Sequence, residues 1–405
     1  MKKILVIASS FPRYKDDWWQ RAVLSIYDNM DLKKYHVTVV APSAPGAKSS
    51  EKINGIYIER FTYFYPKSLQ LLTSGEGVLY SSKKNKYLGK IQVITFVIAE
   101  FVKTISLLAS RDFDVIHANW ILPQGLVAII AKFIFRKPVV ITVHGTDVFA
   151  LKKLNIVKKF ILRFCDVCTA NSSATLEAVN EIYSSPKNKI VYMGVDLKTF
   201  RPENIDNKWR QAFGEDAKLI LSVGRLIKWK GFEYLVRAFP KVLEEVPSAK
   251  LLLIGKGPEE DNLKKIAQKL GLELDKNIFF LGTFGPDKLP NIYASVDIVV
   301  SPSVTIAKTG EKEGMGNVVL EARASGVPVI ASRSGGLKDT VDGKTNGLQF
   351  EDRDYQQLAK HIKYLLLDKK AHDGFARNGY KYVKENFAWK VASTRFCQLY
   401  ETITR

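Results

Sequence analysis

Cysteine is scarce in this sequence, with three residues among 405. So small and odd a number excludes the disulfide framework that stabilises many secreted domains. Cys165 and Cys168 form a CxxC pair, but no second pair or histidine cluster lies near it in the sequence to complete a zinc site. We therefore predict that both thiols pack in a core.

Long unbroken apolar runs are missing as well. The longest, from Ile91 to Leu108, is interrupted by Glu100 and Lys103, whereas a membrane span needs about 20 nearly unbroken apolar residues. The apolar stretch after the first two lysines is too short for a signal peptide and is typical of a first β-strand. The sequence therefore predicts a cytoplasmic protein.

Acidic residues are too few to balance the basic ones. There are 61 Lys and Arg against 41 Asp and Glu, which gives a formal net charge of +20. Residues 1–200 hold 28 of the basic and 15 of the acidic side chains, so most of the excess lies in the first half. Such a field predicts an anionic partner, and nucleic acid, anionic lipid or a phosphorylated acceptor would each fit.

The chain does contain many short Val/Ile/Leu runs that alternate with helical patterns, which is typical of parallel sheets covered on both faces. The predicted strands are 2–9, 36–42, 113–119, 138–145 and 166–172, then 218–226, 249–257, 277–282, 297–303, 328–332 and 347–350. The clearest helix is predicted over 87–110. Two Rossmann-like domains follow, 1–199 and 200–389, with ligands expected at the carboxyl ends of the strands.

Two strand-end loops of the second half carry candidate ligand groups. Arg225 and Lys230 lie on a loop that leads into a helix. The positive potential of the helix N-terminus adds to the charge of these two side chains, and the combination suits a diphosphate. Solvated loop cations are the simpler alternative. Glu313 and Glu321 are separated by seven residues, and the Gly-rich segment 314–316 between them can approach a ligand closely. Chance spacing on a solvated helix is the alternative for this pair.

Together these segments resemble the family-4 retaining glycosyltransferases of the GT-B fold. The run E-GMGNVVL-E-ARASGVPVIAS at 313–332 matches their Glu-x7-Glu signature and the segment that follows it. Further family elements match, in order, at HGTD 144–147, VGRL…KG 223–231, GKGPE 255–259, SGG 334–336 and FAW 387–389. The resemblance implies two Rossmann-like domains that face each other across a cleft. It also implies a C-terminal helix, 390–405, that completes the first domain.

Roles in the second half follow from the same resemblance. Arg225 and Lys230 would bind the diphosphate of a nucleotide-sugar donor, Glu321 would bind its ribose, and Glu313 would lie close to the transferred sugar. That sugar would also meet the backbone of Gly314, Met315, Gly316 and Asn317, where Asn317 is the expected helix N-cap.

The nucleotide itself would lie near Gly255 and Gly257, with its base near Phe284. These two glycines lack the third glycine of a dinucleotide fingerprint, which argues against a nicotinamide or flavin dinucleotide.

In the first half, the resemblance implies that His144 points at the donor sugar. Asp147 would orient His144 or contact an acceptor hydroxyl, and His117, also expected at a strand end, would face the acceptor. A structural imidazole is the alternative for each histidine. The loop after the first strand has no glycine and is similar to a Phe-Pro-Arg loop of bacterial surface-polysaccharide enzymes. It predicts acceptor contacts by Arg13, Asp17, Trp18 and Arg21.

The expected mechanism is retention of anomeric configuration by a front-face reaction, in which the leaving phosphate accepts the proton of the acceptor. Fixed cations and helix N-termini can stabilise that phosphate without a metal. Metal-dependent enzymes normally show Asp-x-Asp after a strand, whereas 112–114 precedes a strand and 352–354 opens a polar helix. We therefore predict no cofactor and no divalent metal.

Residues 60–103 combine aromatic and basic side chains, which suits a membrane interface. The residues concerned are Phe61, Tyr63, Phe64, Tyr65, Lys83, Lys84, Lys86 and Lys90. A packed hairpin with a solvated lysine face is the alternative. The prediction is docking on the inner leaflet, where a lipid-linked saccharide would be the acceptor in polysaccharide or glycolipid assembly.

Two other functions remain open at this point. A GT-B nucleotide-sugar epimerase would keep the two domains, but such enzymes generally lack the HGTD and Glu-x7-Glu arrangement. A nucleic-acid-binding protein would suit the charge, although no nucleic-acid motif or base-stacking aromatic surface accompanies the lysines.

Overall fold

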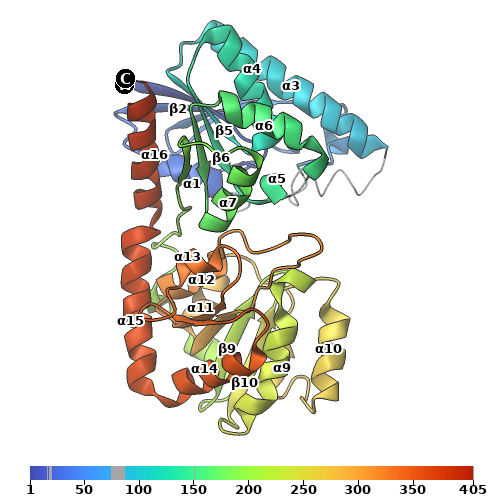
Figure 1. Ribbon diagram of the computed structural model, residues 1–405, viewed down its shortest axis with the longest axis vertical. Coiled ribbons are helices and arrows are strands. Elements are labelled where there is room, and N and C mark those ends of the chain that lie inside the picture. The colour runs from blue at the N-terminus through green and yellow to red at the C-terminus, as the bar shows by residue number, and fades with distance from the viewer. Residues whose placement is uncertain (16, 18–20, 74–86, 150, 405) are drawn as a thin grey trace. The chain divides into compact units, whose positions relative to one another are not determined.

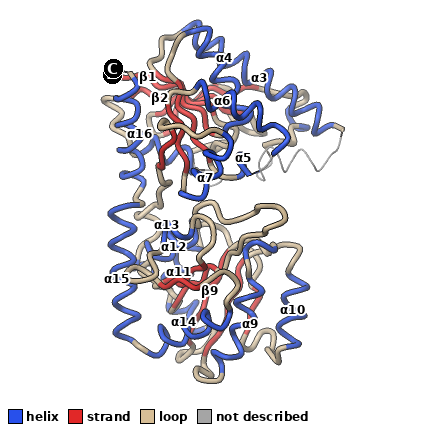
Figure 2. The backbone as a smooth tube through the Cα atoms, in the orientation of Figure 1, coloured by secondary structure: helices blue, strands red, loops and turns tan. Residues whose placement is uncertain are grey.

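The computed structural model describes residues 1–15, 17, 21–73, 87–149 and 151–404. The chain divides into two compact units, each built on one sheet (Figure 1 and Figure 2). Unit 1 consists of residues 1–171, 175–194 and 389–405, and unit 2 of residues 172–174 and 195–388. The main boundary follows Gly194, close to the expected position, and the last helix is part of the first unit.

Unit 1 contains an eight-stranded sheet with the order β3-β4-β2-β1-β5-β6-β7-β8, parallel except for β3 against β4. The strands are β1 (Lys2–Ile7), β2 (Tyr35–Pro42), β3 (Ser50–Ile53), β4 (Ile56–Phe61), β5 (Val115–Asn119), β6 (Val139–Val143), β7 (Val167–Ala170) and β8 (Asn188–Ile190). All five predicted strands of this half are confirmed. The hairpin β3–β4 and the edge strand β8 were not predicted; β3 and β8 are short and partly polar.

Helices cover both faces of this sheet. One face packs against α3 (Leu88–Ser110), α4 (Leu126–Phe135) and α6 (Asn155–Phe164), which share a single core with β5 and β6. On the other face, α1 (Ala22–Asp28) packs against α16 (Trp389–Ile403). The described part of this unit also contains α5 (Thr146–Phe149) and α7 (Ser173–Ile182). Cys165 and Cys168 are buried free thiols, which confirms the packing prediction.

Unit 2 contains a six-stranded parallel sheet with the order β11-β10-β9-β12-β13-β14. Its strands are β9 (Lys218–Val223), β10 (Ala249–Ile254), β11 (Ile278–Phe280), β12 (Ile298–Ser301), β13 (Val329–Ser332) and β14 (Leu348–Phe350). Its helices are α8 (Asn207–Gln211), α9 (Phe232–Leu243), α10 (Glu260–Lys269), α11 (Leu289–Ala294), α12 (Asn317–Ala324), α13 (Leu337–Thr340), α14 (Tyr355–Leu367) and α15 (Lys369–Asn386). All six predicted strands are confirmed, and two apolar clusters share the sheet residues between them.

Helix α3 has an unusual distribution of polarity. Gln92, Glu100 and Thr104 are fully buried, whereas Ile94 and Ile98 are 62% and 57% exposed. The predicted helix over 87–110 is confirmed. Among the described residues, α3 is the one helix whose length and composition would allow it to cross a membrane, and a third of its most apolar window is buried.

The predicted aromatic and lysine surface over 60–103 is wrong for Phe61 and Tyr63, whereas Lys90 is exposed as expected. Phe61 and Tyr63 are buried, and their ring centroids lie 5.0 and 5.2 Å from that of Phe96 in the core. Tyr65 is exposed, and Lys83, Lys84 and Lys86 lie outside the described residues. Phe61 and Tyr63 are part of the core and not of the surface, because α3 covers them.

The buried carboxyl of Glu100 makes a specific prediction. Its Oε1 accepts a hydrogen bond of 2.9 Å from Nε2 of Gln124, and burial raises its pKa to about 8 against the opposing effect of that bond. Between the unfolded value of about 4.3 and pH 8, the folded chain therefore keeps a proton that the unfolded chain releases. The free energy of unfolding should fall across this window as pH rises.

Glu100→Gln should remove that fall, because an amide does not ionise. When the pH is raised from 5 to 8.5, the free energy of unfolding of the variant should increase relative to that of wild type by on the order of a few kcal/mol. Denaturant unfolding of both proteins at the two pH values measures this. An equal difference between them at both pH values would contradict a neutral buried Glu100.

Candidate active site

Four strand-end loops of unit 2 lie backbone against backbone at the carboxyl edge of its sheet. A Cβ on Gly231, whose φ is +66°, would lie 1.9 Å from the carbonyl oxygen of Pro302. A Cβ on Gly255 would lie 1.8 Å from the oxygen of Gly224, and one on Gly336 would lie 2.0 Å from that of Gly314. The loops after β9, β10, β12 and β13 therefore come together only because these positions carry no side chain.

An ion pair joins two of these loops. Nζ of Lys230 lies 2.7 Å from Oε2 of Glu313, and the Oγ of buried Ser303 donates to the same oxygen at 2.9 Å. Both charged side chains are largely shielded from water, at 16% and 10% exposure. Arg225 is exposed on the Lys230 loop. The structure thus brings Lys230 and Glu313 together, as required of a shared site.

Glu321 lies one turn into α12, as predicted. Its Oε2 accepts a hydrogen bond of 3.0 Å from the hydroxyl of Tyr293. Burial raises the pKa of Glu321, while the Tyr293 hydroxyl and the charge of Lys230 oppose that effect. Ser303 and Tyr293 were not identified from the sequence, although Ser303 ends a predicted strand; Tyr293 carries no comparable signal.

The segment between the two glutamates differs in detail from the prediction. Asn317 is the first residue of α12, and the cap position belongs to Gly316 at φ +80°. Met315 is buried, whereas Asn317 is exposed at the helix start. Left-handed backbone at the cap favours glycine, which explains why the asparagine is displaced by one position.

The two glycines assigned to the nucleotide have contacts of their own. The loop that carries Gly255 and Gly257 packs on the β9 loop, where a Cβ on Gly257 would lie 2.3 Å from the oxygen of Leu226. Phe284 follows β11 and packs, partly buried, against the core beside β9 and β10. These residues lie on the loops of three adjacent strands, β9, β10 and β11.

In unit 1, His144 follows β6 at the carboxyl edge. Its Nε2 lies 3.1 Å from Oδ1 of Asn119, and its ring centroid lies 4.7 Å from that of Trp120. Burial lowers the pKa of His144 to about 4, so the ring is neutral at physiological pH. Trp120 has a φ of +79°, a left-handed conformation rare for an aromatic residue and one that clusters at functional sites.

Asp147 holds the backbone around this histidine. Its two carboxylate oxygens accept hydrogen bonds from the N–H groups of Ile121, at 2.9 Å, and of His144, at 3.2 Å. The residue is 4% exposed, and burial raises its pKa against those backbone hydrogen bonds. The orienting alternative fits this geometry, whereas a direct acceptor contact does not.

His117 does not face an acceptor. It lies in the middle of β5, fully buried, with Nδ1 2.7 Å from the hydroxyl of Tyr27 and 2.6 Å from that of Tyr400. Its Nε2 lies 2.7 Å from Oγ1 of Thr142. The expected acceptor role is corrected to a structural one, because Nδ1 faces α1 and α16 while Nε2 faces the neighbouring strand β6.

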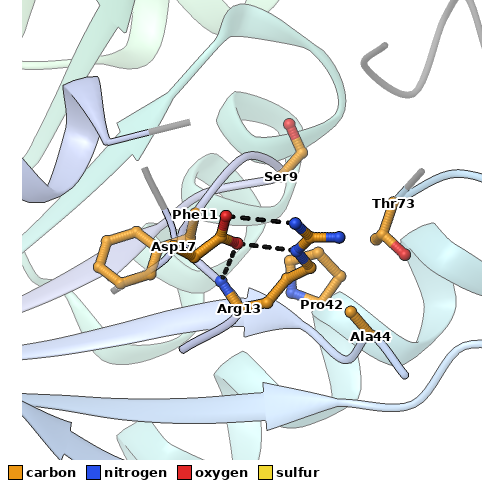
Figure 3. Close-up of a pocket in the computed structure, with 7 residues that line it drawn as sticks. All are labelled: Ser9, Phe11, Arg13, Asp17, Pro42, Ala44 and Thr73. Carbon is orange, nitrogen blue, oxygen red and sulfur yellow. Dashed lines mark hydrogen bonds and ion pairs between the residues drawn. The ribbon is translucent and has the colours of Figure 1, made fainter. Parts of the chain in front are cut away.

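The first-strand loop forms a small hollow in unit 1 (Figure 3). Arg13 and Asp17 line it and bind each other, with Nε to Oδ2 at 2.7 Å and Nη2 to Oδ1 at 3.2 Å. Asp17 is 2% exposed and therefore fixes the loop, while Arg13 remains partly open. Arg21 precedes α1, pairs with Asp28 at 3.6 Å and donates a hydrogen bond of 3.2 Å to the carbonyl oxygen of Lys15 in this loop. Trp18 lies outside the described residues.

The two Asp-x-Asp segments have structural roles. Asp112 pairs with Lys137 at 2.9 Å, and Asp354 caps α14 by accepting from two backbone N–H groups. Across the described ranges, no group of three or more His, Cys, Asp or Glu side chains is placed to hold a metal ion.

Both halves of the chain match known glycosyltransferases. The model of group 1 glycosyl transferases matches residues 203–382, and that of glycosyltransferase family 4 matches residues 20–199. An uncharacterized glycosyltransferase of Methanocaldococcus jannaschii is 30% identical over 76% of this chain and 80% of its own length. A GDP-mannose-dependent phosphatidylinositol monomannoside mannosyltransferase of Mycobacterium tuberculosis is 29% identical over 71% of this chain and 76% of its own length.

Solved structures share the fold at lower identity. Sucrose-phosphate synthase from Thermosynechococcus elongatus superposes with a TM-score of 0.76 at 22% identity, over 100% of this chain and 99% of its own. HepE from Anabaena, solved with UDP, superposes with a TM-score of 0.74 at 22% identity, over 99% of this chain and 100% of its own. The relatives are named as transferases, so the epimerase alternative is not favoured. The chain belongs to family 4 of the glycosyltransferases and has their GT-B fold.

Proposed function

We propose that this glycosyltransferase moves a hexose-type sugar, with retention and without a metal, from a UDP or GDP donor to a lipid-linked saccharide. The observation that carries the donor site is the shielded Lys230–Glu313 pair at the carboxyl edge of the unit 2 sheet. The mycobacterial relative is named for GDP-mannose and HepE was solved with UDP, so the proposal includes both guanine and uracil as the base of the donor. Such a reaction belongs to surface polysaccharide or glycolipid assembly on the cytoplasmic side of the membrane.

The Lys230–Glu313 pair suggests how a diphosphate is received. Without ligand, each group neutralises the other, which limits the cost of desolvating either charge. A donor diphosphate would compete with Glu313 for the ammonium and would add the N-terminus of α9 as a second source of positive potential. The carboxylate released from that pair would be free to accept hydrogen bonds from the hydroxyls of the sugar.

In the proposed step, the bond between the anomeric carbon and the phosphate oxygen breaks as the acceptor oxygen attacks from the same face. The acceptor proton passes to the departing phosphate oxygen, so no protein base is required. Lys230 and Arg225 stabilise the charge that grows on that phosphate. Neutral His144, held by Asn119 and by the Asp147-fixed backbone, is assigned to the hydroxyls of the transferred sugar.

Lys230→Met should lower kcat/KM by about 100-fold or more, the usual loss for one preorganised charge-stabilising group. Lys228→Met is the matched control, because Lys228 lies on the same turn but is exposed. It should stay within a few-fold of wild type. Initial rates of nucleoside diphosphate release measure both variants, and equal losses would contradict the assignment.

His144→Ala should lower kcat with the natural donor and acceptor. Because the pKa of His144 lies near 4, wild-type kcat should show no titration of this residue between pH 5.5 and pH 8. Steady-state rates across that range test both statements. A variant with wild-type kcat, or a wild-type titration near pH 6.5 that His144→Ala abolishes, would contradict the role.

Activity should persist in EDTA, because the charges on Lys230, Arg225 and the α9 N-terminus are proposed to replace a cation. The measurement is the rate after chelation and dialysis, with and without added magnesium or manganese. Loss of activity in EDTA followed by recovery with either metal would refute metal independence.

A further inference from the structure

The outward face of α3 is apolar, whereas its polar residues point into the fold. Ile91, Ile94, Ile98 and Val102 are each more than half exposed and recur at steps of three and four. Gln92 and Glu100 are buried on the opposite side, where each forms a side-chain hydrogen bond. A helix in contact with water is expected to show the reverse pattern, so this face indicates an apolar environment.

The apolar surface continues across two neighbouring helices. Phe133 and Ile134 on α4 are 54% and 55% exposed, and Ile156 on α6 is 84% exposed. The rings of Phe133 and Phe160 have centroids 6.4 Å apart, which joins α4 to α6. Helices α3, α4 and α6 lie side by side over one face of the unit 1 sheet (Figure 1). We call this three-helix surface, made by residues 88–110, 126–137 and 151–164, the α3–α4–α6 face.

The charge of this face has one sign. Its three segments contain ten Lys and Arg and a single acidic residue, Glu100, which is buried. Six of the cations are exposed: Lys90, Arg136, Lys152, Lys153, Lys159 and Arg163. The acidic groups that border the face are already matched, since Glu59 binds Lys103, Asp112 binds Lys137 and Asp166 binds Lys132.

We propose that the α3–α4–α6 face docks on an anionic lipid bilayer, with the isoleucine and phenylalanine side chains in the interfacial region and the lysines at the headgroup phosphates. Apolar area and attraction to anionic lipid together set the strength of such binding. A second copy of the chain fits less well, because a self-complementary contact would bring equal basic rims together.

The position of the face connects it with the proposed acceptor. In this parallel sheet, α3 and α6 precede β5 and β7, so both helices begin at the carboxyl edge, where His144 also lies. Ile91, Lys152 and Lys153 are therefore at the end of the face nearest that edge. The inference deepens the proposed function, which supposes a lipid-linked acceptor, but membrane binding itself requires neither donor nor turnover.

The test is co-sedimentation of the full chain with vesicles of phosphatidylcholine, alone or with phosphatidylglycerol, without donor or acceptor. Binding is expected to the phosphatidylglycerol vesicles and should weaken with salt. Ile94→Asp/Ile98→Asp should lower the partition coefficient at least about tenfold, whereas Ile205→Asp/Leu367→Asp should leave it unchanged. The control makes the same charge change at equally exposed apolar residues of unit 2.

A second pair of variants separates charge from apolar contact. Lys152→Gln/Lys153→Gln should weaken binding about 25-fold at low salt, since each basic residue contributes about fivefold. The far-UV circular dichroism of every variant should match wild type. The proposal is overturned if wild type does not bind phosphatidylglycerol vesicles at low salt, or if Ile94→Asp/Ile98→Asp binds as wild type does. The proposal is also overturned if the only effect of Ile94→Asp/Ile98→Asp is to convert a dimer of the protein into monomers. Because no catalysis is measured, these outcomes are independent of any failure of the transfer reaction.

Discussion

The proposed donor site depends on how closely the strand-end loops of unit 2 pack. Gly231, Gly255 and Gly336 each lie within about 2 Å, measured from a would-be Cβ, of a carbonyl oxygen on a neighbouring loop. That contact brings the β9 loop against the β12 loop and so sets Lys230 beside Glu313. Larger side chains would separate the loops and leave a desolvated cation and carboxylate without each other.

Two of the histidines of unit 1, His117 and His144, have different roles. His117 lies on β5 and His144 directly follows the adjacent strand β6, and burial lowers the pKa of both. His117 is surrounded by Tyr27, Tyr400 and Thr142, whose hydroxyls occupy both of its nitrogens. His144 lies four residues beyond Val140, the register partner of His117, and past the end of β6, where a loop held by Asp147 supports it. Position relative to the sheet edge separates a structural imidazole from a candidate catalytic one.

Much of this architecture could be predicted from the sequence, since eleven apolar runs became parallel strands and the Glu-x7-Glu spacing placed Glu321 one turn into a helix. The errors come from packing across distant segments. His117 looked like a strand-end residue until Tyr400, 283 positions away, was seen against it. Phe61 and Tyr63 looked like a membrane surface because nothing local shows that α3 covers them. The exposed face of α3 was equally hidden, since its period of three and four fits a stripe facing inward or outward.

The central claim is that Lys230 exchanges Glu313 for the second phosphate of the donor. The most direct measurement is the thermal stability of the wild-type protein in EDTA with uridine or guanosine, its monophosphate and its diphosphate. The account predicts that the diphosphate of one base raises Tm well above the shift caused by its monophosphate, because tighter binding to the folded state adds stability. Equal shifts from monophosphate and diphosphate, or none from either, would contradict it.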